Sequence, residues 1–230
     1  MSKLLLINNK RKIKNKVINS HLNSKIDEVI KEKFNQIFSL TGNAIHKNNP
    51  SNKFREDLFN YLYDNHNGKN MLELGTFNGG TTAVMALICK EKGGHVFSID
   101  YKNHKLEIAK NIINKLGLDE YITFLEIDLY NDDYIDQLED KDISVCFIDA
   151  KHTYDSIKMD ATNCKKLEID KIVFHDYGLN SKDGPNLSVK KVINELDLDI
   201  IKLIGEKPNS SIWKTTYGNH DIEGAITSFK

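Results

Sequence analysis

Short apolar runs alternate with amphipathic segments along most of the chain after residue 50. Five runs of strand length lie at residues 71–74, 95–99, 121–125, 143–148 and 171–174. Apolar positions at helical spacing occupy residues 54–67 before the first run and, between or after the runs, residues 81–92, 105–116, 134–138, 154–167 and 187–196. Strands that alternate with helices form a parallel sheet with both faces covered. The pattern therefore predicts a doubly wound α/β fold.

The end of the chain departs from this alternation. Residues 200–204 and 211–214 are two apolar runs separated by a turn through Pro208 and Asn209. Two neighbouring strands with a tight connection predict an antiparallel hairpin. We therefore expect a mostly parallel seven-stranded sheet that finishes in a C-terminal hairpin.

Residues 1–50 are expected to form an N-terminal extension, in which basic residues outnumber acidic ones between Lys3 and Lys33. A solvated arm and a contact with an anionic partner both explain this charge. Ile26, Ile30 and Phe34 recur at helical spacing and predict an amphipathic helix. Its apolar face would cover either its own domain or that of a partner, as in a homo-oligomer. Residues 51–230 show no repeat or linker, which predicts one domain.

Composition and charge exclude several classes of protein. The 230 residues are 40% hydrophobic and 28% charged, which supports a packed core and argues against a disordered chain. No stretch reaches the roughly 18 apolar residues that a membrane helix requires, so we expect no membrane partner. The formal net charge of −1 gives no indication of a nucleic-acid partner. Three cysteines without a CxxC pair indicate reduced thiols and a cytoplasmic protein.

The candidate chemistry lies directly after the predicted strands, because doubly wound folds bind ligands at the carboxyl ends of their strands. The first run leads into Glu73, Gly75, Gly79 and Gly80. Glycines let the backbone turn tightly and approach a ligand closely. Their spacing lacks the GxGxxG of dinucleotide-binding folds, which argues against an NAD-linked oxidoreductase. Glu73 would repel a pyrophosphate and suits a ligand with a positive amino or sulfonium group.

Two further acidic residues follow the next strands. Asp100 ends the second strand, where a carboxylate can accept hydrogen bonds from both hydroxyls of a ribose. Asp128 follows the third strand, within reach of an adenine amino group in such a fold. Acidic residues at the ends of three successive strands predict an adenosyl ligand without phosphates.

From about Phe54 onward the chain resembles the class I S-adenosylmethionine-dependent methyltransferases, whose cofactor pattern matches Glu73, Gly75, Gly79, Asp100 and Asp128. It looks most similar to the metal-dependent O-methyltransferases of the catechol type and of the antibiotic-sugar type (methyltransferase family 24-like). Residues 147–154, FIDAKHTY, are similar to the FIDGDHxY signature of the second group, and residues 174–177, FHDY, to its HDY strand end. The resemblance implies a Rossmann-like methyltransferase domain at residues 51–230.

The same resemblance implies S-adenosyl-L-methionine as the cofactor, together with a divalent cation. The implied cofactor-binding residues are Glu73, Gly75, Phe77, Gly79, Thr81, Asp100, Tyr101, Asp128, Leu129 and Asp149. The family's metal-ligand positions correspond to Asp149, His175 and Asp176. Carboxylate oxygens suit Mg2+, and the histidine leaves Mn2+ open. Without a metal, the same groups would only form hydrogen bonds at the strand end.

Transfer to a hydroxyl also requires a base. His152, three residues after Asp149, is a candidate because histidine titrates near neutral pH. A structural role beside Tyr154 is the alternative for His152. Lys151 replaces the acidic residue of the sugar-methylating group and is a second candidate base if burial lowers its pKa. The expected catalytic residues are therefore Asp149, Lys151 and His152.

We thus expect metal-assisted O-methylation of a hydroxyl on a small molecule or sugar. A protein that binds the cofactor without turnover is one alternative, in which Lys151 marks a lost base. A nucleic-acid methyltransferase is another, suggested by the basic arm. Residues 149–152 read DAKH where amino-directed enzymes of that kind have an NPPY-type or DPPY-type segment, which argues against it. The sequence does not identify the acceptor.

Overall fold

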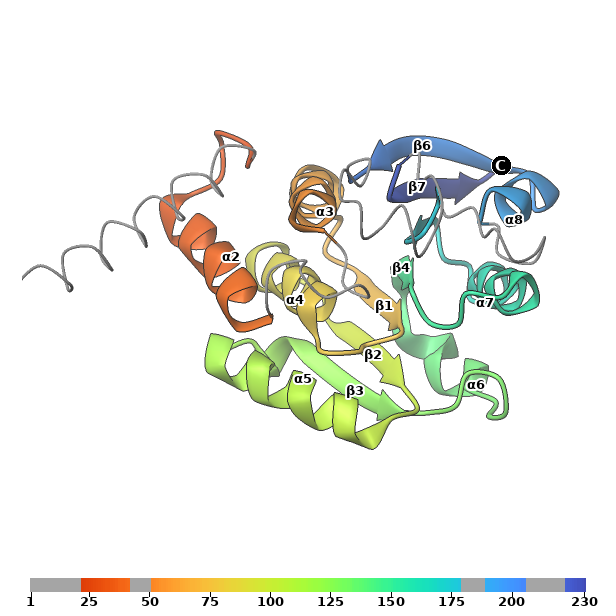
Figure 1. Ribbon diagram of the computed structural model, residues 1–230, viewed down its shortest axis with the longest axis horizontal. Helices are drawn as coiled ribbons and strands as arrows, with labels where there is room; N and C mark the ends of the chain where they lie inside the picture. Colours follow the sequence, from red (N-terminus) through yellow and green to blue (C-terminus); the bar gives the residue numbers. More distant parts are fainter. Residues whose placement is uncertain (1–21, 42–50, 179–188, 206–221) are drawn as a thin grey trace, which may run out of the picture.

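A seven-stranded sheet forms the centre of the computed structural model, which describes residues 22–41, 51–178, 189–205 and 222–230. The strand order is β3-β2-β1-β4-β5-β7-β6 (Figure 1). Strands β1 to β5 run parallel to their neighbours, whereas β7 is antiparallel to both β5 and β6. The strands are β1 Asn70–Leu74, β2 Val96–Asp100, β3 Ile122–Glu126, β4 Ile143–Ile148, β5 Lys171–Phe174, β6 Leu198–Ile204 and β7 Gly224–Phe229. The predicted fold class is confirmed.

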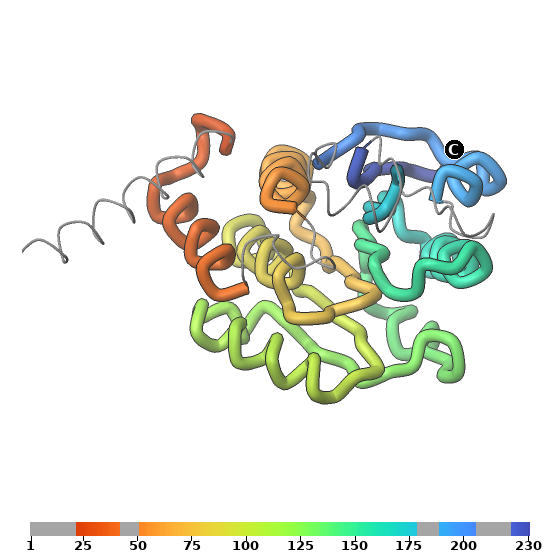
Figure 2. The backbone as a smooth tube through the Cα atoms, viewed as in Figure 1, coloured from red at the N-terminus to blue at the C-terminus, as the bar shows by residue number. Residues whose placement is uncertain are grey.

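Helices cover both faces of the sheet, as the ribbon and the backbone tube show (Figures 1 and 2). One apolar core unites the sheet with α2 Glu28–Thr41, α3 Asn52–Asn65, α4 Gly80–Lys92 and α5 Asn103–Leu116. A second core unites it with α6 Ile135–Leu138, α7 Tyr154–Lys166 and α8 Val189–Glu195. Two short 3-10 helices lie at η1 Asp119–Tyr121 and η2 Glu139–Lys141. No helix within the described ranges is long and apolar enough to cross a membrane.

Local sequence accounts for where these elements begin and how they pack. Ser51 caps α3 by accepting the Phe54 N–H, and Thr153 caps α7 by accepting the Ser156 N–H. Strand β4 is buried at every position, as its sequence ISVCFI, apolar except for Ser144, predicts for a strand covered on both faces. Because β1 to β5 run parallel, their carboxyl ends, and therefore the candidate site residues that follow them, lie along one edge of the sheet.

The amphipathic helix predicted near the N-terminus is confirmed as α2. Its apolar side chains Ile30, Phe34, Ile37 and Phe38 are buried. The helix contacts α4 and α5 of the same chain, and its side chains join the core on that side of the sheet. The apolar face therefore covers its own domain. The basic residues before position 22 lie outside the described residues.

The C-terminal hairpin is present, but its second strand is not the one predicted. Residues 211–214 lie outside the described residues, and the strand that pairs with β6 is β7, at residues 224–229. Its sequence GAITSF mixes small, polar and apolar residues. It therefore contains no run of large apolar side chains that would predict a strand. Pairing with both β5 and β6 holds it in the sheet.

A buried carboxylate on α7 lies behind the loop that follows β4. Asp160 Oδ2 accepts a hydrogen bond from Tyr130 Oη at 3.1 Å, and Asp160 Oδ1 has no hydrogen-bond partner among the described residues. The same tyrosine oxygen accepts the Lys151 backbone N–H at 3.2 Å. Burial raises the pKa of Asp160 from 3.8 to about 7. The carboxyl group therefore makes folding sensitive to pH.

Replacing Asp160 by asparagine is expected to flatten the pH dependence of stability. In the wild type, the folded state keeps a proton that the unfolded state releases between about pH 4 and pH 7, so stability falls as the pH rises through that window. Unfolding in denaturant at pH 5 and pH 8 measures the effect. The free energy of unfolding of Asp160→Asn relative to the wild type should rise by roughly 1–3 kcal/mol between the two pH values. Asp155→Asn, an exposed position of the same helix, should show no such rise.

Candidate active site

The turn after β1 touches the end of β4. Gly75 has a φ of +101°, in the region that favours glycine. A Cβ at this position would lie 2.4 Å from the carbonyl oxygen of Asp149, so only glycine permits the approach. The Asp149 N–H donates to the Leu74 carbonyl at 2.9 Å. The glycine turn predicted to hold a cofactor is therefore adjacent to the predicted metal ligand Asp149.

Asp100 organises the turn at the end of β2. Its Oδ2 accepts the Phe77 N–H at 3.0 Å, and its Oδ1 accepts the Lys102 N–H at 2.9 Å. Phe77 has a φ of +48°, uncommon for a bulky residue, and this hydrogen bond holds it there. An ionised carboxylate offers about four acceptor positions, so two remain for other donors. Asp100 can therefore hold its own turn and accept two ligand hydroxyls.

The other residues predicted to bind a cofactor differ in their exposure to solvent. Gly79 and Thr81 are buried at the amino end of α4, and Leu129 is buried after β3. Tyr101 follows β2 and is 60% exposed, so a ligand can reach its ring, over which the Lys102 ammonium lies at 5.0 Å from the ring centroid. These residues lie along the same edge of the sheet, after β1, β2 and β3.

The carboxylate of Asp128 forms hydrogen bonds within its own loop. Its carboxylate accepts the Tyr130 N–H at 3.1 Å and the Asn131 side-chain amide at 2.6 Å. This arrangement resembles that of Asp100, with the side chain half-buried and some acceptor positions left over. Contact with an adenine amino group stays a prediction.

Glu73 lies inside the protein. It is 1% exposed and accepts hydrogen bonds from Thr82 on α4 and Ser98 on β2, both at 2.5 Å. Burial raises its pKa to about 8. In the described residues its side chain joins β1, β2 and α4, and direct contact with a positive ligand group stays a prediction.

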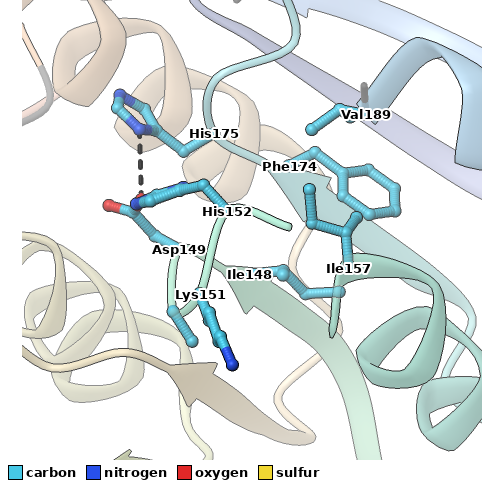
Figure 3. A pocket seen from close by; sticks show the side chains of 9 residues that line it. Ile148, Asp149, Lys151, His152, Ile157, Phe174, His175 and Val189 are labelled. Atoms are coloured by element: carbon cyan, nitrogen blue, oxygen red, sulfur yellow. Dashed lines mark hydrogen bonds and ion pairs between the residues drawn. The ribbon is translucent and has the colours of Figure 1, made fainter. Parts of the chain in front are cut away.

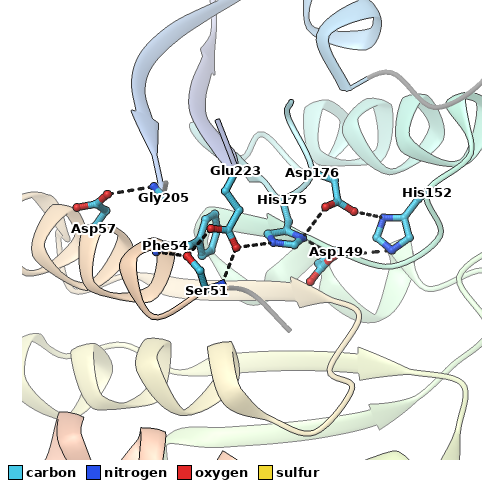
Figure 4. Close-up of polar contacts among 9 residues, drawn as sticks. All are labelled: Ser51, Phe54, Asp57, Asp149, His152, His175, Asp176, Gly205 and Glu223. Carbon is cyan, nitrogen blue, oxygen red and sulfur yellow. Dashed lines mark hydrogen bonds and ion pairs between the residues drawn. The ribbon is translucent and has the colours of Figure 1, made fainter. Parts of the chain in front are cut away.

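Asp149, His175 and Asp176 converge just after β4 and β5 (Figure 4). His175 Nδ1 lies 3.2 Å from Asp149 Oδ1 and 3.3 Å from Asp176 Oδ1. One candidate ligand atom from each residue lies within 4.8 Å of the others. Asp176 has a φ of +56°, a sparsely populated conformation that recurs at functional sites. The structure thus brings together the three residues that the sequence predicted as metal ligands.

Glu223, which the sequence did not single out, completes this cluster. Its Oε1 lies 3.2 Å from His175 Nε2, and its carboxylate also accepts hydrogen bonds from the backbone N–H and hydroxyl of Ser51. Burial alone would lower the pKa of His175, but the carboxylates of Asp149 and Asp176 and the contact with Glu223 raise it well above the usual value. Glu223 lies 48 residues after His175 in no recognisable motif, so only folding reveals it.

The donor set of this cluster fits a divalent cation. Glu223 engages Nε2 of His175, which leaves Nδ1 facing the carboxylates of Asp149 and Asp176. Histidine ligands of metals are commonly oriented in this way by a carboxylate on the other ring nitrogen. Two carboxylates and one imidazole suit Mg2+ or Mn2+. The same groups also satisfy one another by hydrogen bonds, so direct measurement of Mn2+ binding distinguishes the two interpretations.

The two candidate bases lie in different surroundings. His152 Nδ1 lies 3.0 Å from Asp176 Oδ2, and its Nε2 lies 3.9 Å from Asp149 Oδ1. Its side chain is 44% exposed, so a substrate can reach it. Lys151 is exposed and lies over the ring of Tyr130, and Figure 3 shows it directed away from His152 and Asp149. Of these two residues, only His152 therefore belongs to the acidic cluster, and Lys151 lies exposed outside it.

A small pocket opens beside the cluster (Figure 3). Asp149, His152 and His175 contribute polar groups to it. Its apolar walls come from Ile148, Ile157, Phe174 and Val189. Its volume of about 10 Å³ has room for about one water molecule, so the pocket marks where polar and apolar side chains meet. Residues 179–188 and 206–221 lie outside the described residues.

Known proteins resemble this chain in its central domain and in its fold. Residues 72–177 match the family model described as a methyltransferase domain. No curated protein matches the chain. Cofactor-bound Rv0187 from MTB has a TM-score of 0.61 at 14% identity, over 89% of this chain and 91% of its own.

Two solved O-methyltransferases are similar to the same extent. TomG from Streptomyces achromogenes, involved in tomaymycin synthesis and solved with SAM, has a TM-score of 0.59 at 15% identity, over 90% of this chain and 92% of its own. The Bacillus cereus O-methyltransferase solved with SAH has a TM-score of 0.60 at 14% identity, over 89% and 92%. At such low identity these likenesses show a shared fold. Together with the strand order they confirm that this chain has the Rossmann-like methyltransferase fold, within which residues 72–177 match the model of a methyltransferase domain.

Proposed function

We propose that this protein transfers a methyl group from S-adenosyl-L-methionine to a hydroxyl of a small molecule, assisted by a divalent cation. One observation carries the proposal: the turn at Gly75 lies against Asp149, whose side chain belongs to the cluster with His152, His175 and Asp176. A methyl donor held by the turns after β1 and β2 would thus lie next to the groups that can bind and deprotonate a hydroxyl. The SAM and SAH complexes of similar folds support this choice of donor.

The chain's own residues divide the work of binding and proton transfer. Asp100 accepts hydrogen bonds from the ribose hydroxyls with the acceptor positions that Phe77 and Lys102 leave unused. Tyr101 offers an exposed ring beside it for the adenine. His152 accepts the proton of the acceptor hydroxyl. At the same time the hydroxyl oxygen bonds to the methyl carbon, and the bond between that carbon and the cofactor sulfur breaks. Asp176 orients His152 through the 3.0 Å contact with Nδ1.

A divalent cation held by Asp149, His175 and Asp176 would lower the pKa of the bound hydroxyl and fix its position. Glu223 keeps the His175 ring in place through Nε2, and Ser51 anchors Glu223 in turn. Ser51 is also the cap of α3. The start of that helix, the segment at Glu223 and the cluster of Asp149, His175 and Asp176 therefore form one network of polar contacts (Figure 4).

Methyl-transfer assays with isotope-labelled S-adenosyl-L-methionine test the proposal. We expect label to reach hydroxyl acceptors such as catechols, phenols or sugars in the presence of Mg2+ or Mn2+, and to fall to background when EDTA removes the metal. Electron paramagnetic resonance of Mn2+ should show one bound ion per chain. Transfer that is insensitive to EDTA would contradict the metal, and a product methylated on nitrogen would contradict the hydroxyl acceptor. SAH binding without transfer to any acceptor would favour a protein that binds the cofactor without turnover.

A further inference from the structure

The loop at residues 149–153 contributes two side chains to the acidic cluster, those of Asp149 and His152. Hydrogen bonds hold its backbone at both ends. The Asp149 N–H donates to the Leu74 carbonyl at 2.9 Å, and Thr153 caps α7. The sheet and α7 therefore fix the two ends of the loop.

A tyrosine from the segment between β3 and α6 holds the middle of this loop. Tyr130 Oη accepts the Lys151 N–H at 3.2 Å. Among the described residues, no other hydrogen bond involves the backbone of residues 150–152. The Lys151 ammonium also lies over the Tyr130 ring, 5.4 Å from its centroid, which adds a cation–π contact. Tyr130 thus holds both the backbone and the side chain of the residue directly before His152.

A buried carboxyl group on α7 fixes the direction of the Tyr130 hydroxyl. Asp160 is fully buried, and its Oδ2 accepts the Tyr130 O–H at 3.1 Å. Burial raises the pKa of Tyr130, so the hydroxyl keeps the proton that it donates. Because this proton points at Asp160, a lone pair of the oxygen is left for the Lys151 N–H. The carboxyl group, the phenol and the loop backbone therefore form one chain of hydrogen bonds.

This chain reaches the candidate base without touching the pocket. Neither Tyr130 nor Asp160 lines the pocket beside the cluster. A base must lie within hydrogen-bond reach of the proton that it accepts, and a displacement of about 1 Å can lower the rate by roughly 100-fold. We propose that Tyr130, oriented by Asp160, is a positioning residue that holds His152 in place for proton transfer. This inference rests on the proposed function, which makes His152 the base.

Removal of the tyrosine hydroxyl tests this assignment. Tyr130→Phe should lower single-turnover methyl transfer to catechol in Mg2+ by roughly 10- to 100-fold, because the base loses its alignment with the acceptor hydroxyl. The KM for catechol and the affinity for S-adenosylhomocysteine should each change by less than about threefold, as expected for a residue that acts on the chemical step. Asp128 accepts the backbone N–H of residue 130, which this variant keeps. Nuclear magnetic resonance should show that the Lys151 amide, without its acceptor, exchanges with solvent about tenfold faster or more.

Variants of Asp160 separate the orientation of the hydroxyl from packing. Asp160→Leu removes the acceptor and should lower transfer to the same extent as Tyr130→Phe. Asp160→Asn keeps a carbonyl oxygen that can accept the same proton, so its rate should fall by less than about threefold. The double variant Tyr130→Phe/Asp160→Leu should be no slower than either single variant, because both changes break the same chain of hydrogen bonds.

Tyr134→Phe is the matched control. Tyr134 lies in the same segment, and its buried hydroxyl accepts a hydrogen bond from Asn163 of α7 at 3.1 Å. Its loss should leave the transfer rate and the exchange of the Lys151 amide unchanged.

Three results would overturn the inference. The first is an unchanged transfer rate or an unchanged Lys151 amide exchange in Tyr130→Phe. The second is an equal loss of rate in Tyr130→Phe and Tyr134→Phe, and the third is a parallel loss of affinity for S-adenosylhomocysteine. Either of the last two would make the hydroxyl part of the general packing. A wild type that transfers no methyl group to any hydroxyl acceptor would instead contradict the proposed function, and the amide exchange would then still decide whether Tyr130 holds the loop.

Discussion

Asp149→Ala is expected to lower methyl transfer by about 10³-fold or more, while the affinity for S-adenosylhomocysteine changes by only a few-fold. The side chain contacts His175 and faces His152, so its removal takes one carboxylate from the proposed cation and from the proton-accepting group. Loss of a group that acts in proton transfer or metal binding typically lowers the rate of the reaction by about 10²- to 10⁴-fold. The backbone of residue 149, which Gly75 touches, is unchanged in this variant.

Single-turnover kinetics and calorimetry of the purified variant measure the two effects separately. Asp155→Ala, an exposed carboxylate in the first turn of α7, is the matched control and should keep full activity. Thermal unfolding should show that both variants are folded. Transfer by Asp149→Ala within tenfold of the wild type would show that the cluster is not the reaction centre. A parallel loss of cofactor affinity would instead assign Asp149 mainly to cofactor binding.

Asp100→Ala is expected to weaken S-adenosylhomocysteine binding by roughly 100-fold. Two hydrogen bonds from ribose hydroxyls to a carboxylate would be lost, each contributing on the order of 1.5 kcal/mol or more. The variant also frees the Phe77 N–H, which the carboxylate holds in a turn with positive φ. The change therefore removes both the acceptor and the order of the turn that presents it.

Glu126→Ala provides the control for Asp100→Ala. Glu126 pairs with Asp100 in the sheet register, also ends its strand and is exposed, with a hydrogen bond to Asn103. Its loss should leave the calorimetric affinity for S-adenosylhomocysteine unchanged. If Asp100→Ala binds the ligand as tightly as the wild type, the ribose hydroxyls are bound elsewhere. Equal weakening in both variants would point to general disorder of this edge of the sheet.

The pattern of apolar runs was sufficient to predict the fold class, because each buried strand and each amphipathic helix is a local signal. The runs at residues 143–148 and 171–174 appear in the structure as β4 and β5 with those bounds. The exception is β7, whose mixture of small, polar and apolar residues gains stability from pairing on both sides. Long-range pairing of this kind has no local signature.

The candidate site also has some features that the sequence predicts and others that it does not. Asp100, Asp149, His175 and Asp176 were predictable because strand ends meet along one edge of a parallel sheet. Glu73 also stood out in the sequence, yet the structure encloses it between Thr82 and Ser98. Burial depends on every element packed around a residue, so a motif cannot report it.

The order of the elements, the glycine turn after β1 and the acidic residues that follow the strands can all be read from the amino-acid sequence. Which groups meet depends on tertiary packing: Glu223 contacts His175 across 48 residues, and Ser51 at the start of α3 contacts Glu223. Periodicity and turn chemistry act over a few neighbouring residues, whereas these contacts form only when distant segments pack together.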